Sequence, residues 1–178
     1  MQYKKVTDNC TMMRATWSEI LSAIKQLKNK IPEIYNMSGV YGIPRGGLPF
    51  AVAISEEYAI PYLTEPKEGC LVVDDDIGYG TSILPYYEKG YKCTAFACMD
   101  ITPEELKKKV TLMTPIQATK GTWLAYPWTS FTGDSLKLLK TAQAEGKTLE
   151  EYISDKPWIA VSQEAIAKAQ KILKRSGK

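Results

Sequence analysis

Three consecutive aspartates form the part of this chain best suited to chemistry. Asp74, Asp75 and Asp76 come at the end of a short apolar run that begins at Cys70. Ionised carboxylates only accept hydrogen bonds, so Asp74 and Asp75 suit ligand hydroxyl groups, or a magnesium ion and its waters. The residue types therefore indicate a site for a polyhydroxylated ligand, a hydrated cation, or both.

A glycine-rich turn with two hydroxyl residues follows the acids. Gly78 and Gly80 allow backbone amides to turn toward an anion with no side chain in the way. Thr81 and Ser82 add hydroxyl donors where the next helix is expected to begin. This half of the segment favours a phosphate, and the whole segment favours a sugar phosphate.

The apolar run itself predicts how these residues are held. A strand that is apolar on both faces is typical of the centre of a parallel sheet. Ligands of such sheets collect at the carboxyl ends of the strands. A second strand, Ser38 to Ile43, ends in Pro44, Arg45 and two glycines. The fork of Arg45 matches phosphate geometry, so this loop is a second candidate anion site.

These segments resemble the motifs of the type I phosphoribosyltransferases. The segment from Cys70 to Ser82 has the signature of four apolar residues, two acids and a loop closing in Gly-Thr. Residues 40–51 are similar to the family's pyrophosphate loop. Residues 122–128 resemble the base-contacting segment of bacterial xanthine-guanine phosphoribosyltransferases. The resemblance extends from about Thr16 to Trp128.

The resemblance implies a reaction and a set of roles. The donor would be 5-phosphoribosyl-1-pyrophosphate (PRPP) with magnesium, and a nitrogenous base would displace its pyrophosphate. The residues that the resemblance assigns to catalysis are Asp74, Asp75 and Arg45, with the first two also serving the metal. Those that it assigns to ligand binding are Pro44, Gly46, Gly47, Asp76, Ile77, Gly78, Tyr79, Gly80, Thr81, Ser82, Trp123 and Leu124. Trp123 would stack on the base, and the peptide bond between Pro44 and Arg45 would be cis.

Three departures from the family pattern bear on activity. Members that use 6-oxopurines carry an aspartate, their expected proton acceptor, where this chain has Gly78. The same members place a lysine near the position of Cys98, where it contacts the oxygen of the base. Most members also have a mobile loop before the acidic strand, and here only Thr64–Gly69 joins Leu63 to Cys70. We therefore expect guanine, hypoxanthine and xanthine to be poor acceptors.

Other functions fit parts of the pattern. An apolar run ending in acids also occurs in Walker B motifs, but the chain has no Gly-x-x-x-x-Gly-Lys-Ser/Thr segment. Asp74 to Asp76 could hold the metal of a nucleotide-sugar glycosyltransferase, or form a solvated strand end. The leading alternative is a protein that binds a nucleotide or sugar phosphate without transferring it, as a regulator.

Strands alternating with helices predict an α/β fold with a parallel sheet flanked by helices, a small hood and a helical C-terminal extension. We expect one domain over 1–178, with a core of about 16–128 and an extension of about 129–178. The expected helices cover Trp17–Lys30, Gly47–Tyr58, Ser82–Lys89, a short segment from Thr102, Ser135–Glu145, Thr148–Ile153 and Ser162–Arg175. The expected strands cover Ser38–Ile43, Ile60–Leu63, Cys70–Asp75, Thr94–Met99, Thr111–Ile116 and Thr122–Tyr126.

Composition is typical of a compact cytoplasmic protein. The chain has 178 residues, 44% of them hydrophobic, and a net charge of +3 with acids and bases interspersed, so no dedicated nucleic-acid binding is expected. No apolar leader or membrane-spanning run is present. Cys70 and Cys98 lie in strand patterns and are expected to be reduced core residues. The resemblance and the apolar residues from Ile83 to Tyr87 indicate a homodimer.

Overall fold

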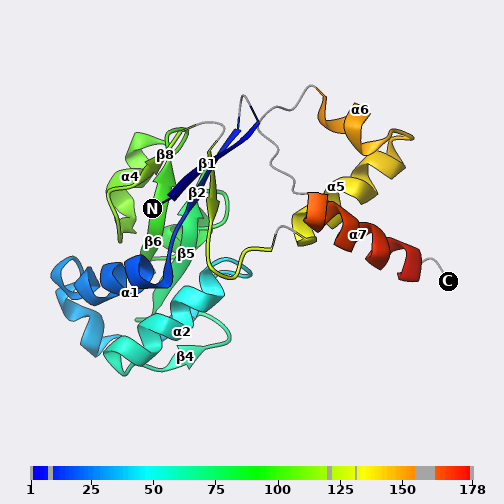
Figure 1. Ribbon diagram of the computed structural model, residues 1–178. Coiled ribbons are helices and arrows are strands. Elements are labelled where there is room, and N and C mark those ends of the chain that lie inside the picture. Colours follow the sequence, from blue (N-terminus) through cyan, green and yellow to red (C-terminus); the bar gives the residue numbers. More distant parts are fainter. Residues whose placement is uncertain (1, 8–9, 120–121, 131, 155–162, 177–178) are drawn as a thin grey trace. The chain divides into compact units, whose positions relative to one another are not determined.

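The computed structural model describes residues 2–7, 10–119, 122–130, 132–154 and 163–176 (Figure 1). The chain divides into two compact units. The larger unit is Thr16–Lys120, and the smaller one combines Met1–Ala15 with Gly121–Lys178. The larger unit begins where the expected core begins and ends earlier than residue 128. That the whole chain forms a single domain stays a prediction.

A parallel sheet forms the centre of the larger unit, as the alternation of strands and helices predicts (Figure 1). Its strand order is β4-β3-β5-β6-β7, and β8 pairs with β6. The strands are β3 (Val40–Gly42), β4 (Tyr62–Leu63), β5 (Leu71–Ile77), β6 (Lys92–Met99), β7 (Thr111–Leu112) and β8 (Gln117–Ala118). In β5, Leu71, Val72 and Val73 are fully buried, as expected of a central strand.

Helices cover both faces of this sheet. They are α1 (Trp17–Gln26), α2 (Gly47–Tyr58), α3 (Leu84–Glu88) and α4 (Glu104–Lys109), with 3-10 turns at Leu27–Asn29 and Pro32–Asn36. Phe50 of α2 packs against Phe96 of β6, with ring centroids 5.3 Å apart. The neighbouring Ala95 belongs instead to the buried cluster that contains Leu106 of α4. Because successive strand residues point to opposite faces, α2 and α4 cover opposite sides of the sheet.

The local sequence signals set most boundaries of these elements. A capping box of Thr16 and Glu19 begins α1, with the Thr16 amide donating to the Glu19 carboxylate over 2.8 Å. The helix expected to reach Lys30 ends at Gln26 and continues as a 3-10 turn. The helix expected over Ser82–Lys89 is the shorter α3. Trp17, expected to be a packing residue, is 50% exposed.

The smaller unit contains a second sheet and the C-terminal helices. β1 (Gln2–Thr7) and β2 (Cys10–Arg14) are antiparallel, and β9 (Thr122–Ala125) is parallel to β2. The sequence did not predict β1 or β2, whereas β9 lies within the strand expected over Thr122–Tyr126. That this sheet forms a hood stays a prediction. The helices are α5 (Thr132–Ala144), α6 (Leu149–Ile153) and α7 (Gln163–Ser176).

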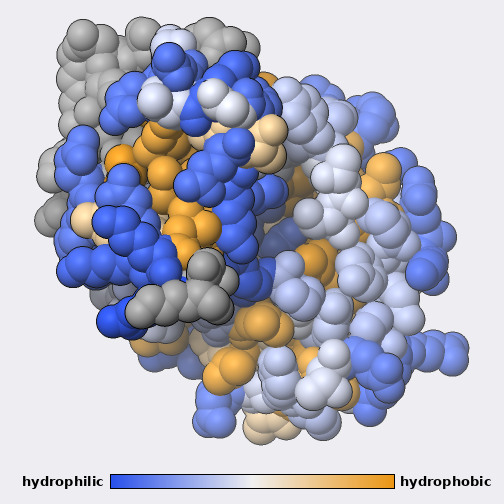
Figure 2. Space-filling view, turned by 90° about the vertical axis from the view of Figure 1, so that its right-hand side faces the viewer, coloured by the Kyte–Doolittle hydropathy of each residue, from blue (hydrophilic) through white to orange (hydrophobic). Residues whose placement is uncertain are grey.

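The helices of the smaller unit pack through a small apolar cluster of Leu139, Leu149 and Ala169. Leu138 and Ile166 at its edge are only partly buried. Apolar side chains are visible on this part of the surface, framed by hydrophilic ones (Figure 2). Trp128, in the same unit, stacks on Tyr126 with ring centroids 5.3 Å apart, whereas Trp158 lies outside the described residues.

In the part of the chain that the structure describes, no helix has the length and apolar character needed to cross a membrane.

Candidate functional site

A cavity of about 380 Å³ lies at the carboxyl ends of β3 and β5. It is the place where a parallel sheet is expected to bind its ligand. Its lining consists of Ile43, Pro44, Arg45, Gly46, Asp74, Asp75, Asp76, Ile77, Gly78, Tyr79, Gly80, Thr81, Ser82 and Ile83. The structure thus brings together the two segments that the sequence indicated as anion sites and the acids between them.

The loop after β3 approaches the acids through a glycine. A Cβ atom added to Gly46 would overlap the carboxyl group of Asp75, and one added to Gly47 would overlap the carbonyl oxygen of Val73. Only glycine therefore allows this loop to lie directly against the end of β5. The peptide bond between Pro44 and Arg45 is cis, as predicted.

The three acids are bound to one another through the backbone. The Asp75 amide donates to Asp74 Oδ1 over 3.0 Å, and the Asp76 amide donates to Asp75 Oδ1 over 2.9 Å. The Asp75 carboxyl group faces the Gly46 loop. All three acids line the cavity.

Burial makes this end of β5 unfavourable for negative charge. Asp74 is only 7% exposed, and burial, followed by the charge of Asp75, raises its pKa to about 8. Burial and then the same neighbouring charge raise the pKa of Asp76 to about 7. Ligand groups that donate hydrogen bonds or carry positive charge would therefore be stabilised here.

The two glycines of the turn after the acids differ in the space that surrounds them. A Cβ atom added to Gly78 would meet nothing within 4 Å, so a side chain would fit at this position. Gly80 has a φ of +84°, and an added Cβ atom would overlap the Leu106 side chain. The exposed Thr81 and Ser82 follow, and the Leu84 amide donates to the Gly80 carbonyl over 2.9 Å.

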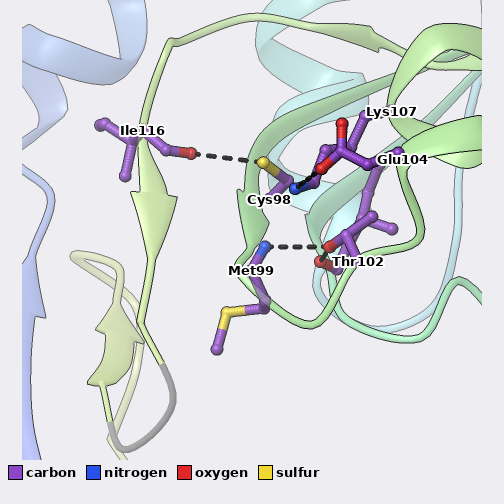
Figure 3. Close-up of polar contacts among 7 residues, drawn as sticks. Cys98, Met99, Thr102, Glu104, Lys107 and Ile116 are labelled. Atoms are coloured by element: carbon purple, nitrogen blue, oxygen red, sulfur yellow. Dashed lines mark hydrogen bonds and ion pairs between the residues drawn. The ribbon is translucent and has the colours of Figure 1, made fainter.

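A buried threonine holds this turn, and the sequence analysis did not find it. Thr102 is 3% exposed, and its hydroxyl donates to the Ile77 carbonyl over 2.5 Å. The same oxygen accepts from the Met99 amide over 3.1 Å (Figure 3). Thr102 therefore ties the end of β5 to the end of β6 directly before Gly78. The sequence places Thr102 at the start of an expected short helix, and no local pattern there indicated its contact with Ile77.

Cys98, near the position where the family places a lysine, is a buried residue of β6. Cys98 is 3% exposed and is not among the described residues that line the cavity. Its Sγ lies 3.8 Å from the Ile116 carbonyl, beside the ion pair of Glu104 with Lys107 (Figure 3). Burial raises the pKa of its thiol. As expected, Cys98 and Cys70 are buried and form no disulfide.

Two predicted ligand residues belong to the other unit. Trp123 and Leu124 lie in β9, and Leu124 is buried. The side chain of Trp123 lies outside the described part, so its stacking on a base stays a prediction. Gly47 supports the loop from the first turn of α2 and is not part of the cavity lining.

The connection that replaces the mobile loop of the family is short and fixed at its end. The Cys70 amide donates to the Lys67 carbonyl over 3.1 Å. The Ser38 hydroxyl donates to the Glu68 carbonyl over 2.7 Å. Both contacts lie before β3 and β5 begin, at the end of the sheet away from the cavity. Thr64–Gly69 is therefore a turn that provides no cover for the site.

Solved structures with a similar fold are phosphoribosyltransferases. The Helicobacter pylori xanthine-guanine-hypoxanthine phosphoribosyltransferase has a TM-score of 0.53 and 14% identity, over 73% of this chain and 99% of that one. The purine phosphoribosyltransferase of Pyrococcus horikoshii Ot3 has a TM-score of 0.50 and 23% identity, over 67% and 95%. The chain has the type I phosphoribosyltransferase fold.

A third similar structure is a hypothetical protein from Neisseria gonorrhoeae with bound ppGpp. Its TM-score is 0.50 and its identity 16%, over 74% of this chain and 97% of that one. No protein-family model matches the sequence, and a search of curated proteins finds no match. At these identities the structural likeness establishes the fold alone.

The raised pKa values of Asp74 and Asp76 predict a pH-dependent stability. Between 3.8, the ordinary pKa, and about 8, the folded state holds protons that the unfolded state has released. The free energy of unfolding should then fall as pH rises, by at most about 1.4 kcal/mol per pH unit for each group. Thermal unfolding from pH 4 to pH 9 measures this.

Asp74→Asn should flatten that pH profile, whereas Glu56→Gln, an exposed change on α2, should leave it as it is. Equal profiles for the wild type and Asp74→Asn would contradict the assignment to Asp74.

Thr102 should position the Gly78–Ser82 turn. Thr102→Val removes the hydroxyl and leaves the buried Ile77 carbonyl unpaired, which should destabilise the fold by about 1 to 3 kcal/mol. It should also weaken binding of ribose 5-phosphate more than binding of pyrophosphate, because pyrophosphate is assigned to the Gly46 loop. Thr102→Ser keeps the hydroxyl and should restore both properties. Calorimetry that showed equal losses for both ligands would assign Thr102 a structural role only.

Proposed function

We propose that this chain binds PRPP and transfers its phosphoribosyl group to a nitrogenous base. The observation that carries the proposal is the convergence of two anion loops and a pair of acids on one cavity. The fold, which is shared with phosphoribosyltransferases, supports the same reaction class.

Each part of the donor has a matching part of the cavity. The turn from Gly78 to Ser82 would hold the 5-phosphate through its amides and hydroxyls. Asp74 and Asp75 would accept hydrogen bonds from the ribose hydroxyls. Arg45 and the backbone of Gly46 would hold the pyrophosphate. Because Gly46 lies close to Asp75, the leaving group would then be next to the sugar.

Asp74 and Asp75 also suit a magnesium ion that arrives with the donor. In the described residues, no group of three or more His, Cys, Asp or Glu side chains could hold a metal by itself. Magnesium commonly uses only one or two carboxylates, with substrate phosphates and waters completing its shell. When bound, the ion would neutralise charge on the pyrophosphate. Its positive charge would also offset the cost of ionising Asp74.

The protein would act mainly by positioning and charge stabilisation. Loss of pyrophosphate leaves positive charge on the anomeric carbon, in an oxocarbenium-like transition state. Once ionised, the carboxylates of Asp74, which is buried, and Asp75, which is half-buried, would favour developing positive charge more than they would in water. Arg45 would stabilise the negative charge of the departing pyrophosphate.

Binding without transfer is the second candidate function. It is favoured by the absence of an acid at Gly78 and by the short turn Thr64–Gly69, since water would reach the reacting carbon. The similar Neisseria structure contains ppGpp, a nucleotide that carries the same sugar-phosphate chemistry. A regulator that senses such a nucleotide would need the same phosphate loop and no transfer step. The nucleotide-sugar glycosyltransferase reading receives no support from the fold.

We extend the proposal to a cytoplasmic homodimer in a base-salvage pathway. The buried, unpaired cysteines are consistent with a reducing compartment, which cell fractionation would test. Ile83 is buried, whereas Tyr86 and Tyr87 pack against the core and are only partly buried. A partner subunit would instead provide cover for the open cavity. Light scattering that returned only the 19.9 kDa monomer would exclude the dimer.

Donor binding should depend on the acids and on the phosphate turn. Asp75→Asn and Thr81→Val should each weaken PRPP binding by about 1 to 3 kcal/mol, because each removes a hydrogen-bond partner of a charged ligand. Thr64→Val, an exposed change in the connecting turn, is the matched control. Titration calorimetry with PRPP and Mg²⁺ measures the three affinities. A pyrophosphate-release assay with a panel of bases then separates transfer from binding alone.

Guanine, hypoxanthine and xanthine should be poor acceptors. Gly78→Asp should raise the rate of phosphoribosyl transfer to them. The loss of a general base typically lowers the reaction rate by a factor of about 100 to 10,000. The open space around Gly78 accommodates the new side chain without a clash. Gly78→Asn adds the same volume without a base and is the control. Rapid turnover of guanine by the unmodified chain would overturn the expectation.

A further inference from the structure

Tyr79 is the cavity residue to which the proposed reaction gives no task. Its side chain is 73% exposed, although it lies within a ligand cavity. Among the described residues it has no hydrogen bond or ring contact, whereas Tyr41 pairs with Tyr86 and Tyr35 with Tyr58. Single exposed aromatic rings are common on protein surfaces, but this one borders a cavity, where a planar ligand can cover it.

The rest of the cavity lacks a flat apolar surface. Of the described residues that line it, Tyr79 is the sole aromatic one, and most others are acids, glycines or hydroxyl residues. Such a lining suits phosphate and sugar hydroxyls. A planar base needs an aromatic or apolar face on which to stack. Within the lining, Ile43, Ile77 and Ile83 are aliphatic, and Tyr79 is the residue that offers an aromatic face.

The backbone around Tyr79 holds the ring at the cavity while leaving space beside it. On one side, Gly80 packs against Leu106 and continues into the turn that begins α3. On the other side, the Thr102 hydroxyl fixes the Ile77 carbonyl. Between these anchors, the Cβ position of Gly78 is open. The ring of Tyr79 therefore has room to turn about its own side-chain bonds without a change in the anchors.

We propose that Tyr79 is the base-contacting residue of this site, and that it stacks on the planar heteroaromatic base of a nucleotide or acceptor. The inference rests on the proposed function, since it takes the sugar-phosphate position as given. A stacked Tyr79 ring would also have a second effect, on the access of water. A ring stacked over the ligand covers part of a cavity for which Thr64–Gly69 supplies no lid, and so reduces the access of water.

The test compares the binding of nucleotides with the binding of ribose 5-phosphate, which has no base. Affinities of AMP, GMP, UMP and ribose 5-phosphate are measured by titration calorimetry for the wild type and for Tyr79→Leu, Tyr79→Phe and Trp123→Leu. We expect Tyr79→Leu to weaken binding of at least one nucleotide by about 5- to 150-fold, the range of a base-aromatic stack. Ribose 5-phosphate binding should change by less than about twofold, and Tyr79→Phe should bind like the wild type.

The possible outcomes separate this inference from the proposed function. If the wild type binds no ribose 5-phosphate, the proposed function fails and the inference fails with it. If ribose 5-phosphate binds, but Tyr79→Leu leaves every nucleotide affinity unchanged, only the inference fails. A loss confined to Trp123→Leu would also overturn it. Because Tyr79 is exposed, the thermal unfolding midpoint of Tyr79→Leu should match the wild type, which excludes a folding defect as the cause.

Discussion

The close approach of the Gly46 backbone to the Asp75 carboxyl group is the constraint on which the site depends. It requires β3 and β5 to be neighbours in a parallel sheet, so that their carboxyl ends meet at one edge. It also requires glycine at 46 and 47, because a Cβ atom at either position would overlap β5. With this contact in place, a loop suited to pyrophosphate and acids suited to ribose form one cavity.

The same arrangement concentrates negative charge where the protein stabilises it poorly. The strand that carries the acids is largely buried, and burial is the first cause of the raised pKa values of Asp74 and Asp76. Such a site gains stability when a cation or hydroxyl donors enter it. A bound cation or hydroxyl donor would thus supply compensation that the fold lacks, which is a feature of binding sites more than of structural cores.

The differences from phosphoribosyltransferase motifs lie in the chemistry around the sugar and not in its binding. The phosphate turn, the acids and the Gly46 loop are all present. What differs is the group beside the base, where Gly78 has no side chain, and the cover above it, where Thr64–Gly69 forms a fixed turn. Donor binding and the nature of the acceptor are therefore separate questions for this chain. The exposed ring of Tyr79 bears on the nature of the acceptor.

The sequence by itself determined the features that depend on neighbouring residues. The apolar run from Leu71 to Val73 specified a buried strand, and the glycines and hydroxyls after it specified an anion-binding turn. The motif resemblance also predicted the cis bond before Arg45. These signals are local, because the periodicity of a strand and the φ freedom of a glycine are written within a few residues.

The tertiary structure alone decided the contacts between distant parts of the chain. Thr102 reaches back to Ile77, Cys98 is buried away from the cavity, and Tyr79 is left exposed beside it. The strands β1 and β2 were missed because the sheet that they form depends on the pairing of β2 with β9, which lies far along the chain. Such contacts depend on which surfaces meet when the chain folds. A local pattern identifies residues able to bind a ligand, but the packing of the sheet and helices determines which of them face the same cavity.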